Sequence, residues 1–278
     1  MGYRSRKQLI IVAIIIIFFV LVGTGVYFAY FRHVATCFDG IQNQGETGVD
    51  CGGPCSFSCE RLTIRDVQVN WVKYLNLQDN QYDLIAQIAN PNPNYGVSDL
   101  KYTFKIYDSS GKEIKDQSGA SFILPNQQKY LIEGGVNVGA PIGKIELAIE
   151  PTAQKDWAET STDYQTPNIY VLNRQFSALD NPPGASQVSG TIKNDSPFDF
   201  DSIVVSIVLL DADKQIIGVN KTEANTVMAG EERYFNATWF TPIDKSRLDS
   251  IDIQADTNLL SDNNFMQKYG APEKFQEY

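Results

Sequence analysis

The chain has 278 residues, of which 43% are hydrophobic and 20% are charged, a composition typical of a globular protein long enough for two domains. The chain has 33 acidic and 23 basic residues, and its first 33 positions hold four of the basic residues and none of the acidic ones. The remainder therefore carries a formal charge of −14, which repels nucleic acid and anionic lipid and excludes a nucleic-acid partner.

The first predicted element is an apolar helix at the N-terminus. Leu9–Phe31 contains 23 residues and no charge, and a helix of that length crosses a bilayer core of ~30 Å at ~1.5 Å per residue. Three basic residues lie within positions 4–7, whereas only Arg32 and His33 follow the apolar run. The positive-inside rule then predicts a single-pass cell-membrane protein with a cytoplasmic N-terminus and the bulk of the chain extracytoplasmic.

A cleaved signal peptide is the alternative interpretation of the same segment. Its apolar core would be Leu9–Val22, but cleavage needs small residues in an A-x-A-like arrangement. Gly23–Gly25 is the best candidate and matches that arrangement poorly. We therefore predict an uncleaved anchor.

All four cysteines lie within 23 positions that follow the apolar run: Cys37, Cys51, Cys55 and Cys59. Outside the membrane, thiols oxidise and persist as disulfides, so four cysteines predict two bridges whose pairing the sequence does not decide. The spacing of the last three would also suit a zinc site, but zinc needs reduced thiols and the predicted topology argues against them.

Side-chain oxygens recur every three or four positions between these cysteines, among glycines that allow tight turns. The candidate calcium ligands are Asp39, Asn43, Glu46 and Asp50. Calcium takes six to eight such oxygens, and extracellular modules bind it weakly. The alternative is that these residues form turns through bonds to their own backbone and bind no ion.

The pattern C-x-D-G-x-x-N-x-x-E-T-x-x-D-C-G-G-x-C-x-x-x-C at residues 37–59 resembles a cysteine-rich motif of exported bacterial surface proteins. It is also similar, more distantly, to the acidic calcium loops of thrombospondin type 3 repeats. The resemblance implies a surface location and covers only this segment.

Beyond Cys59 the sequence contains two copies of one β unit. Residues 88–114 align with residues 192–217, so that Asn90 lies opposite Asn194 and Asp108 lies opposite Asp211. In both copies apolar residues alternate with other residues and lead into a turn, as in a strand followed by a hairpin. A repeat of roughly 90 to 100 residues has the size of one β-sandwich.

Phe104-Lys-Ile-Tyr-Asp108 in the first copy resembles the F-x-[L/I]-Y-D signature of the FxLYD domain, an immunoglobulin-like, LEA-like sandwich of exported prokaryotic proteins. The second copy, Ile207–Asp211, is a degenerate version. The resemblance implies a mainly β chain with two tandem immunoglobulin-like sandwiches and no catalytic residue. The first and third signature positions should face the core, and the aspartate should open the turn.

The predicted divisions are a basic N-terminus at 1–8, a transmembrane helix at 9–31, a cysteine-rich segment at 34–61, a first sandwich at 62–150, a linker at 151–167, a second sandwich at 168–258 and a polar tail at 259–278.

The sequence predicts binding rather than catalysis. His33 is the one histidine, and the chain has no phosphate loop, no H-E-x-x-H and no G-x-S-x-G. Val204 and Val208 are apolar on the outward side of a predicted strand where the first copy has Lys101 and Lys105. They should pack against the linker or the other sandwich, or else contact a partner.

We therefore predict a membrane-anchored surface protein whose tandem domains bind or scaffold an envelope or surface protein. An accessory subunit of a pilus, secretion or transport complex is the alternative. An envelope hydrolase ranks third.

Overall fold

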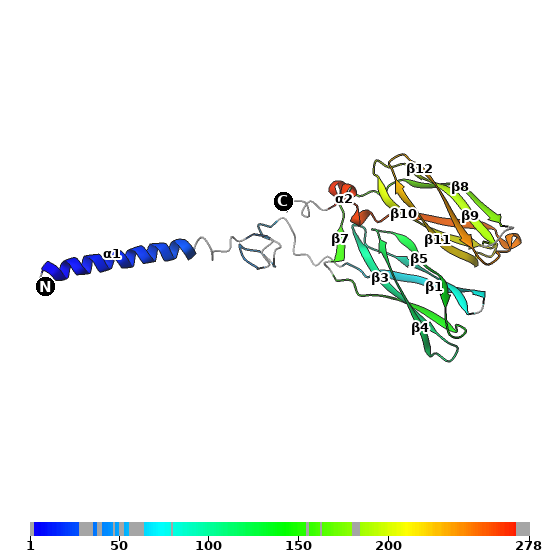
Figure 1. The fold of residues 1–278 in the computed structure, drawn as a ribbon, viewed down its shortest axis with the longest axis horizontal. Helices are drawn as coiled ribbons and strands as arrows, with labels where there is room; N and C mark the ends of the chain where they lie inside the picture. Colours follow the sequence, from blue (N-terminus) through cyan, green and yellow to red (C-terminus); the bar gives the residue numbers. More distant parts are fainter. Residues whose placement is uncertain are drawn as a thin grey trace. The chain divides into compact units, whose positions relative to one another are not determined.

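The computed structural model describes residues 3–27, 36–37, 41–46, 48–49, 53–55, 64–78, 80–153, 156–161, 163–179 and 184–270. The chain divides into two compact units, Met1–Thr63 and Ile64–Tyr278. Strands dominate the second unit, which confirms the mainly β prediction (Figure 1).

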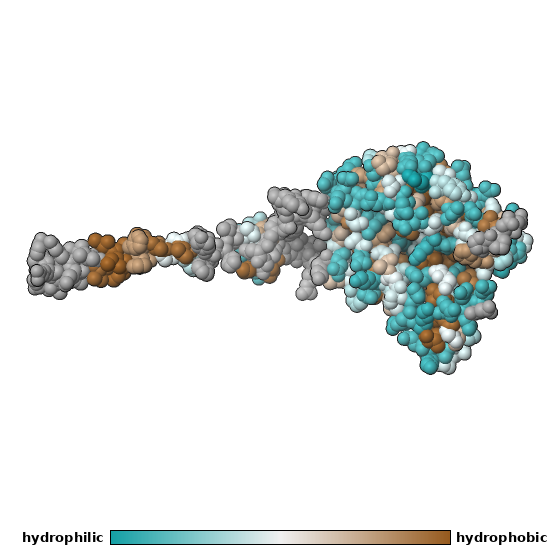
Figure 2. All heavy atoms as spheres, viewed as in Figure 1, coloured by the Kyte–Doolittle hydropathy of each residue, from teal (hydrophilic) through white to brown (hydrophobic). Residues whose placement is uncertain are grey.

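The first unit begins with helix α1, Tyr3–Val26. The large apolar side chains between Val12 and Val26 are exposed, and nine of them are consecutive, from Ile14 to Val22. Figure 2 shows this helix as an almost continuous hydrophobic surface along its described side chains. Within the described residues, no helix combines the length and apolar character that a membrane crossing requires.

The second unit contains two β-sandwiches, sandwich 1 and sandwich 2, with the same strand order. The strands of sandwich 1 are β1 (Gln68–Gln78), β2 (Gln81–Ala89), β3 (Tyr95–Tyr107), β4 (Glu113–Ile123), β5 (Gln128–Asn137) and β6 (Lys144–Ile149). The strands of sandwich 2 are β8 (Ile169–Ala178), β9 (Ser186–Asn194), β10 (Phe200–Leu210), β11 (Ile216–Val227), β12 (Glu232–Trp239) and β13 (Ser250–Asp256). A short 3-10 turn, η3 (Lys245–Arg247), precedes β13.

Both sandwiches place their first, second and fifth strands in one antiparallel sheet and their third, fourth and sixth in the other. The sheets are β1–β2–β5 with β4–β3–β6 in sandwich 1, and β8–β9–β12 with β11–β10–β13 in sandwich 2. This shared topology is what a duplicated unit predicts. Phe104 and Ile106 are fully buried in sandwich 1, and Ile207 and Leu209 in sandwich 2, so the predicted core faces of β3 and β10 are confirmed.

The aligned aspartates open equivalent hairpin turns. Asp108 Oδ1 accepts hydrogen bonds from the backbone of Ser110 at 2.8 Å and Lys112 at 3.0 Å. Asp211 Oδ1 accepts from Asp213 at 3.1 Å and Gln215 at 2.8 Å. The turn-opening role predicted for both aspartates is therefore confirmed.

The aligned asparagines are buried and tie together two corners of each sandwich. Asn194 Nδ2 donates to the carbonyls of Phe198 at 2.7 Å, Met228 at 3.1 Å and Val227 at 3.3 Å. Its Oδ1 accepts from Ser196 N at 3.1 Å and Ser196 Oγ at 2.6 Å. The amide group thus joins the β9–β10 connection to the β11–β12 turn.

In sandwich 1, Asn90 makes the equivalent hydrogen bonds. Its Nδ2 donates to Tyr95 O at 2.6 Å and Leu124 O at 2.9 Å, and its Oδ1 accepts from Asn92 N at 3.0 Å. The two buried amides explain why the alignment found asparagine at both positions.

The predicted linker and tail differ from expectation, because both contribute to the fold. Within 151–167, β7 (Trp157–Glu159) pairs with the start of β3, and Trp157 is buried. Within 259–278, the described residues form a 3-10 turn, η4 (Leu259–Ser261), and helix α2 (Asn263–Tyr269).

The tail segment closes the end of the sandwich 2 core. Its buried side chains are Leu259, Leu260, Phe265 and Met266, which join the same cluster as Phe122 and Leu124 of sandwich 1. Gly96 leaves room for this packing, because a Cβ there would lie 2.7 Å from both the backbone oxygen of Ile123 and Leu260 Cδ1. The polar tail is therefore corrected to a structural cap, because its few apolar residues fill a space that the strands leave open.

Candidate functional site

The cysteine-rich segment contains one described disulfide, Cys37–Cys55, with its Cα atoms 5.7 Å apart. This bridge confirms that cysteines of the segment are oxidised, and it excludes these two as zinc ligands in this state. Cys51 and Cys59 lie outside the described residues, so the second predicted bridge stays a prediction.

Two of the four candidate calcium ligands can be located, and both take part in a turn. Glu46 is buried, and its Oε2 accepts a hydrogen bond from Asn43 N at 3.2 Å. Glu46 Oε1 lies 3.2 Å from Cys55 Sγ, and Glu46 N donates to Asn43 O at 2.9 Å. These contacts agree with the turn-forming alternative, and calcium binding by the same oxygens stays a prediction. Asp39 and Asp50 lie outside the described residues.

The apolar outward positions of β10 contact sandwich 1. Val208 is 2% exposed and packs in a cluster with Ile85, Ile132 and Val219. Val204 is half-buried and lines a cleft of about 470 Å³ beside that cluster. A partner contact at Val208 is therefore wrong for the intact unit, because sandwich 1 already covers this side chain.

The contact between the sandwiches joins the outer faces of two sheets (Figure 1). The β1–β2–β5 face contributes Trp71, Leu75, Ile85, Tyr130 and Ile132. The β10–β11–β13 face contributes Val208, Leu210, Ile216 and Val219. Because apolar area removed from water on both sides stabilises the contact, the two sandwiches behave as one body rather than as two domains on a flexible linker.

Polar groups border this apolar contact. Tyr130 Oη donates to Asp252 Oδ2 at 2.8 Å, and Tyr130 N donates to Gln254 Oε1 at 3.1 Å. Burial, with the Asp252 carboxylate, raises the pKa of Tyr130 to about 12. Lys129 is 3% exposed, with its Nζ 3.6 Å from Asp256 Oδ2 and 3.4 Å from the Phe122 ring centre. Burial lowers the pKa of Lys129, and Asp256 partly opposes that effect.

A second cleft, of about 490 Å³, lies at the other side of the contact and contains a buried acid. Asp83 is 4% exposed, and its Oδ1 accepts from Gly135 N at 2.9 Å. Burial raises the pKa of Asp83, and the Gly135 N–H opposes that rise. Among the described residues that line this cleft Asp83 is the one carboxylate, whereas glycoside hydrolysis uses a pair.

The outer face of the β8–β9–β12 sheet is the most apolar exposed surface among the described strands of sandwich 2. Tyr234 is 61% exposed, Tyr170 46% and Leu172 38%. Leu172 and Tyr234 both pair with Thr191 in the strand register, so they lie in one row across the sheet. Exposed aromatic groups that end in a hydroxyl are favoured at protein contacts. We name this surface the β8–β9–β12 face.

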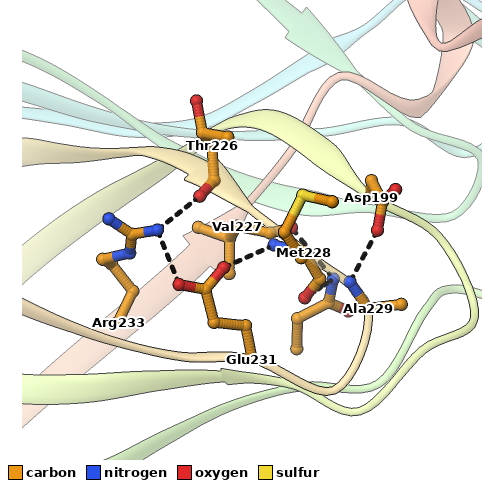
Figure 3. Close-up of polar contacts among 8 residues, drawn as sticks. Asp199, Thr226, Val227, Met228, Ala229, Glu231 and Arg233 are labelled. Atoms are coloured by element: carbon orange, nitrogen blue, oxygen red, sulfur yellow. Dashed lines mark hydrogen bonds and ion pairs between the residues drawn. The ribbon is translucent and has the colours of Figure 1, made fainter.

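Hydrogen bonds fix the β11–β12 turn, which borders this face at the start of β12 (Figure 3). Glu231 Oε2 accepts from Met228 N at 2.8 Å, and the Arg233 guanidinium donates to Thr226 O at 2.7 Å and Glu231 Oε1 at 2.6 Å. Asp199 Oδ1 accepts from Ala229 N at 2.7 Å. These bonds fix the β11–β12 turn, so the edge is preorganised before any partner arrives.

No protein-family model matches the sequence, and no curated protein matches it. Three solved structures show distant likeness. A protein assigned as a β-galactosidase from Bacteroides fragilis has a TM-score of 0.19 and 9% identity over 64% of this chain. The tandem CBM22 domains of Xyn10C from Paenibacillus barcinonensis have a TM-score of 0.15 and 11% identity over 69% of this chain and 83% of their own length.

The third structure, the exo-chitosanase CsxA of Amycolatopsis orientalis, has a TM-score of 0.14 and 12% identity over 67% of this chain. The chain spans 32% of the first of these proteins and 26% of the third. At such low TM-scores these likenesses carry no argument about function.

Sequence reasoning missed the β8–β9–β12 face although its signal was present. Tyr170 and Leu172 occupy alternate positions of β8, and Tyr234 precedes the buried Phe235 in β12. An alternating apolar pattern does not tell which side of a strand faces the core when both sides carry large apolar residues. Only the sheet register separates them.

Proposed function

We propose that this chain is a membrane-anchored extracytoplasmic surface protein whose paired sandwiches bind another envelope or surface protein. The β8–β9–β12 face carries the proposal, because it exposes aromatic and aliphatic side chains on a rigid sheet. Large exposed apolar side chains in one patch are typical of interaction sites. Each sandwich has its first, second and fifth strands in one sheet, which supports the expectation of immunoglobulin-like domains.

The proposed anchor is the apolar segment Leu9–Phe31, whose residues up to Val26 belong to helix α1. Consecutive exposed apolar residues on an α-helix cover its whole circumference, since 3.6 residues make one turn. A helix that is apolar on all sides is stable only when protein or lipid surrounds it. The absence of charge between positions 9 and 31 and the basic residues before it support a single-pass orientation with a cytoplasmic N-terminus.

Calcium binding in the cysteine-rich segment is a further proposal, supported by the spacing of its oxygen-bearing residues. Calorimetric titration of the full chain in detergent with calcium should give heat at millimolar concentration. A Glu46→Gln variant is the matched control and should reduce it, since the amide keeps the size of the carboxylate. No heat from the parent chain would leave the turn-forming role alone.

An accessory subunit of a pilus, secretion or transport complex would use the same face for a fixed partner. An envelope hydrolase is the third candidate. Neither cleft between the sandwiches supports it, because the described lining of each contains one carboxylate, Glu223 in the first and Asp83 in the second, whereas glycoside hydrolysis uses a pair. We therefore propose a protein without catalytic activity.

Topology and binding can be tested together in intact cells that produce the full chain with a tag at each end. External protease should remove the C-terminal tag and leave the N-terminal tag, which is the internal control. A membrane-impermeant lysine cross-linker, added before protease, should join the chain to a second protein. Survival of the C-terminal tag until the cells are lysed would contradict the topology, and a chain that stays uncross-linked would contradict the binding function.

A further inference from the structure

Equivalent strands of the two sandwiches carry equivalent rows of side chains. The rows are Trp71–Gln87–Tyr130 across β1, β2 and β5, and Leu172–Thr191–Tyr234 across β8, β9 and β12. The first row lies in the contact between the sandwiches, where the rings of Trp71 and Tyr130 are 5.9 Å apart. The second row is exposed. Sandwich 1 contacts sandwich 2 through the outer face of β1–β2–β5. The equivalent face of sandwich 2, the β8–β9–β12 face, is not covered by sandwich 1.

The covered copy shows what such a surface binds. Its apolar side chains pack on Val208 and Val219, and its tyrosine donates a hydrogen bond to the carboxylate of Asp252 on the neighbouring strand β13. The recognised surface is thus a sheet face with β-branched side chains at its centre and carboxylates beside them.

We propose that the β8–β9–β12 face binds the outer sheet face of a β-sandwich in a partner protein, one that presents apolar side chains flanked by carboxylates. This inference rests on the proposed function and names the partner's chemistry. Tyr234 occupies the position of Tyr130 and would donate to a partner carboxylate. Lys193 of β9 also lies beside Tyr234, with its Nζ 3.8 Å from Glu232 Oε1 of β12.

The uncovered face is less apolar than the covered one, which predicts a reversible contact. Ser189 and Asn236 stand in the row that Ile85 and Ile132 fill in sandwich 1. Two buried isoleucines are thus replaced by polar residues. Interfaces with fewer apolar anchors dissociate more readily than permanent ones.

A second copy of this chain is not the partner, because neither of its two candidate faces is available. The β10–β11–β13 face is covered by sandwich 1. The equivalent face of sandwich 1 has Lys105 paired with Asp116 in the strand register, where sandwich 2 has Val208 paired with Val219. Burying these charges is costly, and their presence prevents head-to-tail contacts that would otherwise continue into fibres.

The difference between the Lys105–Asp116 pair and the Val208–Val219 pair provides the test. Two substitutions on the outer face of β4–β3–β6 can give sandwich 1 the apolar pair that a partner face would need. Glu146 lies opposite Lys105 as Asp252 lies opposite Val208, so the carboxylate is already in position. The variant Lys105→Val with Asp116→Val keeps the net charge and restores the apolar pair. Sedimentation of the full chain in detergent should show concentration-dependent association for this variant and much less for the parent.

Adding Tyr234→Asp to the variant should weaken the association on the order of tenfold or more, the effect of removing a central aromatic contact. Asn137→Asp is the control, because it adds the same charge at an exposed position of β5, a strand that belongs to neither of the two sheets. No association by the double-valine variant, or association that Tyr234→Asp leaves unchanged, would overturn the inference.

The outcome is separable from that of the proposed function. In the cell experiment, a cross-linked partner whose yield Tyr234→Asp leaves unchanged would keep the binding function and reject this face. Association of the double-valine variant in detergent, lost with Tyr234→Asp, together with no cross-linked protein in cells, would support the face and reject the binding function.

Discussion

Replacing Val208 with lysine should destabilise the two-sandwich unit by about 3–5 kcal/mol, the cost of an uncompensated buried charge. Val208 is 2% exposed and is surrounded by Ile85, Ile132 and Val219. Asp252 lies opposite Val208 in the strand register, but its carboxylate already accepts a hydrogen bond from Tyr130, so an ammonium group at position 208 would disrupt the contact even where it reached this acid. Denaturant unfolding of the full chain in detergent would measure the loss. Protease cleavage between the sandwiches should also accelerate, because the contact that holds them together opens.

Val204→Lys is the matched control for this prediction. It places the same group four residues earlier on the same side of β10, but at a half-buried position that borders a cleft. The ammonium can reach water there, so we expect a loss of less than about 1 kcal/mol. Equal losses for the two variants would mean that the sandwiches do not bury Val208 in solution.

Replacing Asn194 with aspartate should cost about 3 kcal/mol or more at neutral pH. Asn194 Nδ2 donates to three backbone carbonyls, and a carboxylate oxygen at that site would face three acceptors with no proton to share. A buried charge deprived of donors is the costly case of polar burial. Asn137→Asp, at an exposed position of β5, is the control and should change stability by a few tenths of a kcal/mol.

The pH dependence of this variant follows from the same contacts. Burial against carbonyls would raise the pKa of the new carboxyl above its unfolded value, so the unfolded state releases its proton first as pH rises. The loss relative to the parent should therefore grow as pH rises above about 4 and shrink again in acid. Asn90→Asp should behave alike in sandwich 1. A loss that is the same at both ends of this range would show that the charge is not its cause.

Pairing of the two sandwiches changes how the chain can work. Two sandwiches on a flexible linker would each expose both of their outer faces. Here one outer face of each sandwich is buried in the contact with the other. The cap from η4 and α2 adds to this, because its buried residues join a core that also contains Phe122 and Leu124 of sandwich 1. The β8–β9–β12 face of sandwich 2 stays exposed in this paired arrangement.

Local structure could be predicted from the sequence because it depends on neighbours along the chain. Alternation of apolar residues placed Phe104 and Ile106 in the core, and the aligned Asp108 and Asp211 marked the hairpin turns, since both roles are set within a few residues. The duplication was visible for the same reason. The oxidised state of the cysteines was predictable in part, as the Cys37–Cys55 bridge confirms.

Only the tertiary structure decided which outward faces are covered. Val208 and Tyr234 read alike in the sequence, each an apolar residue on a strand, yet one is 2% exposed and the other 61%. Burial at such positions depends on contacts between segments that lie far apart in the chain, as when Ile85 and Ile132 cover Val208. The polar-looking tail became a cap for the same reason, because Phe265 packs against Tyr164 and Phe198, which lie far from it in the chain.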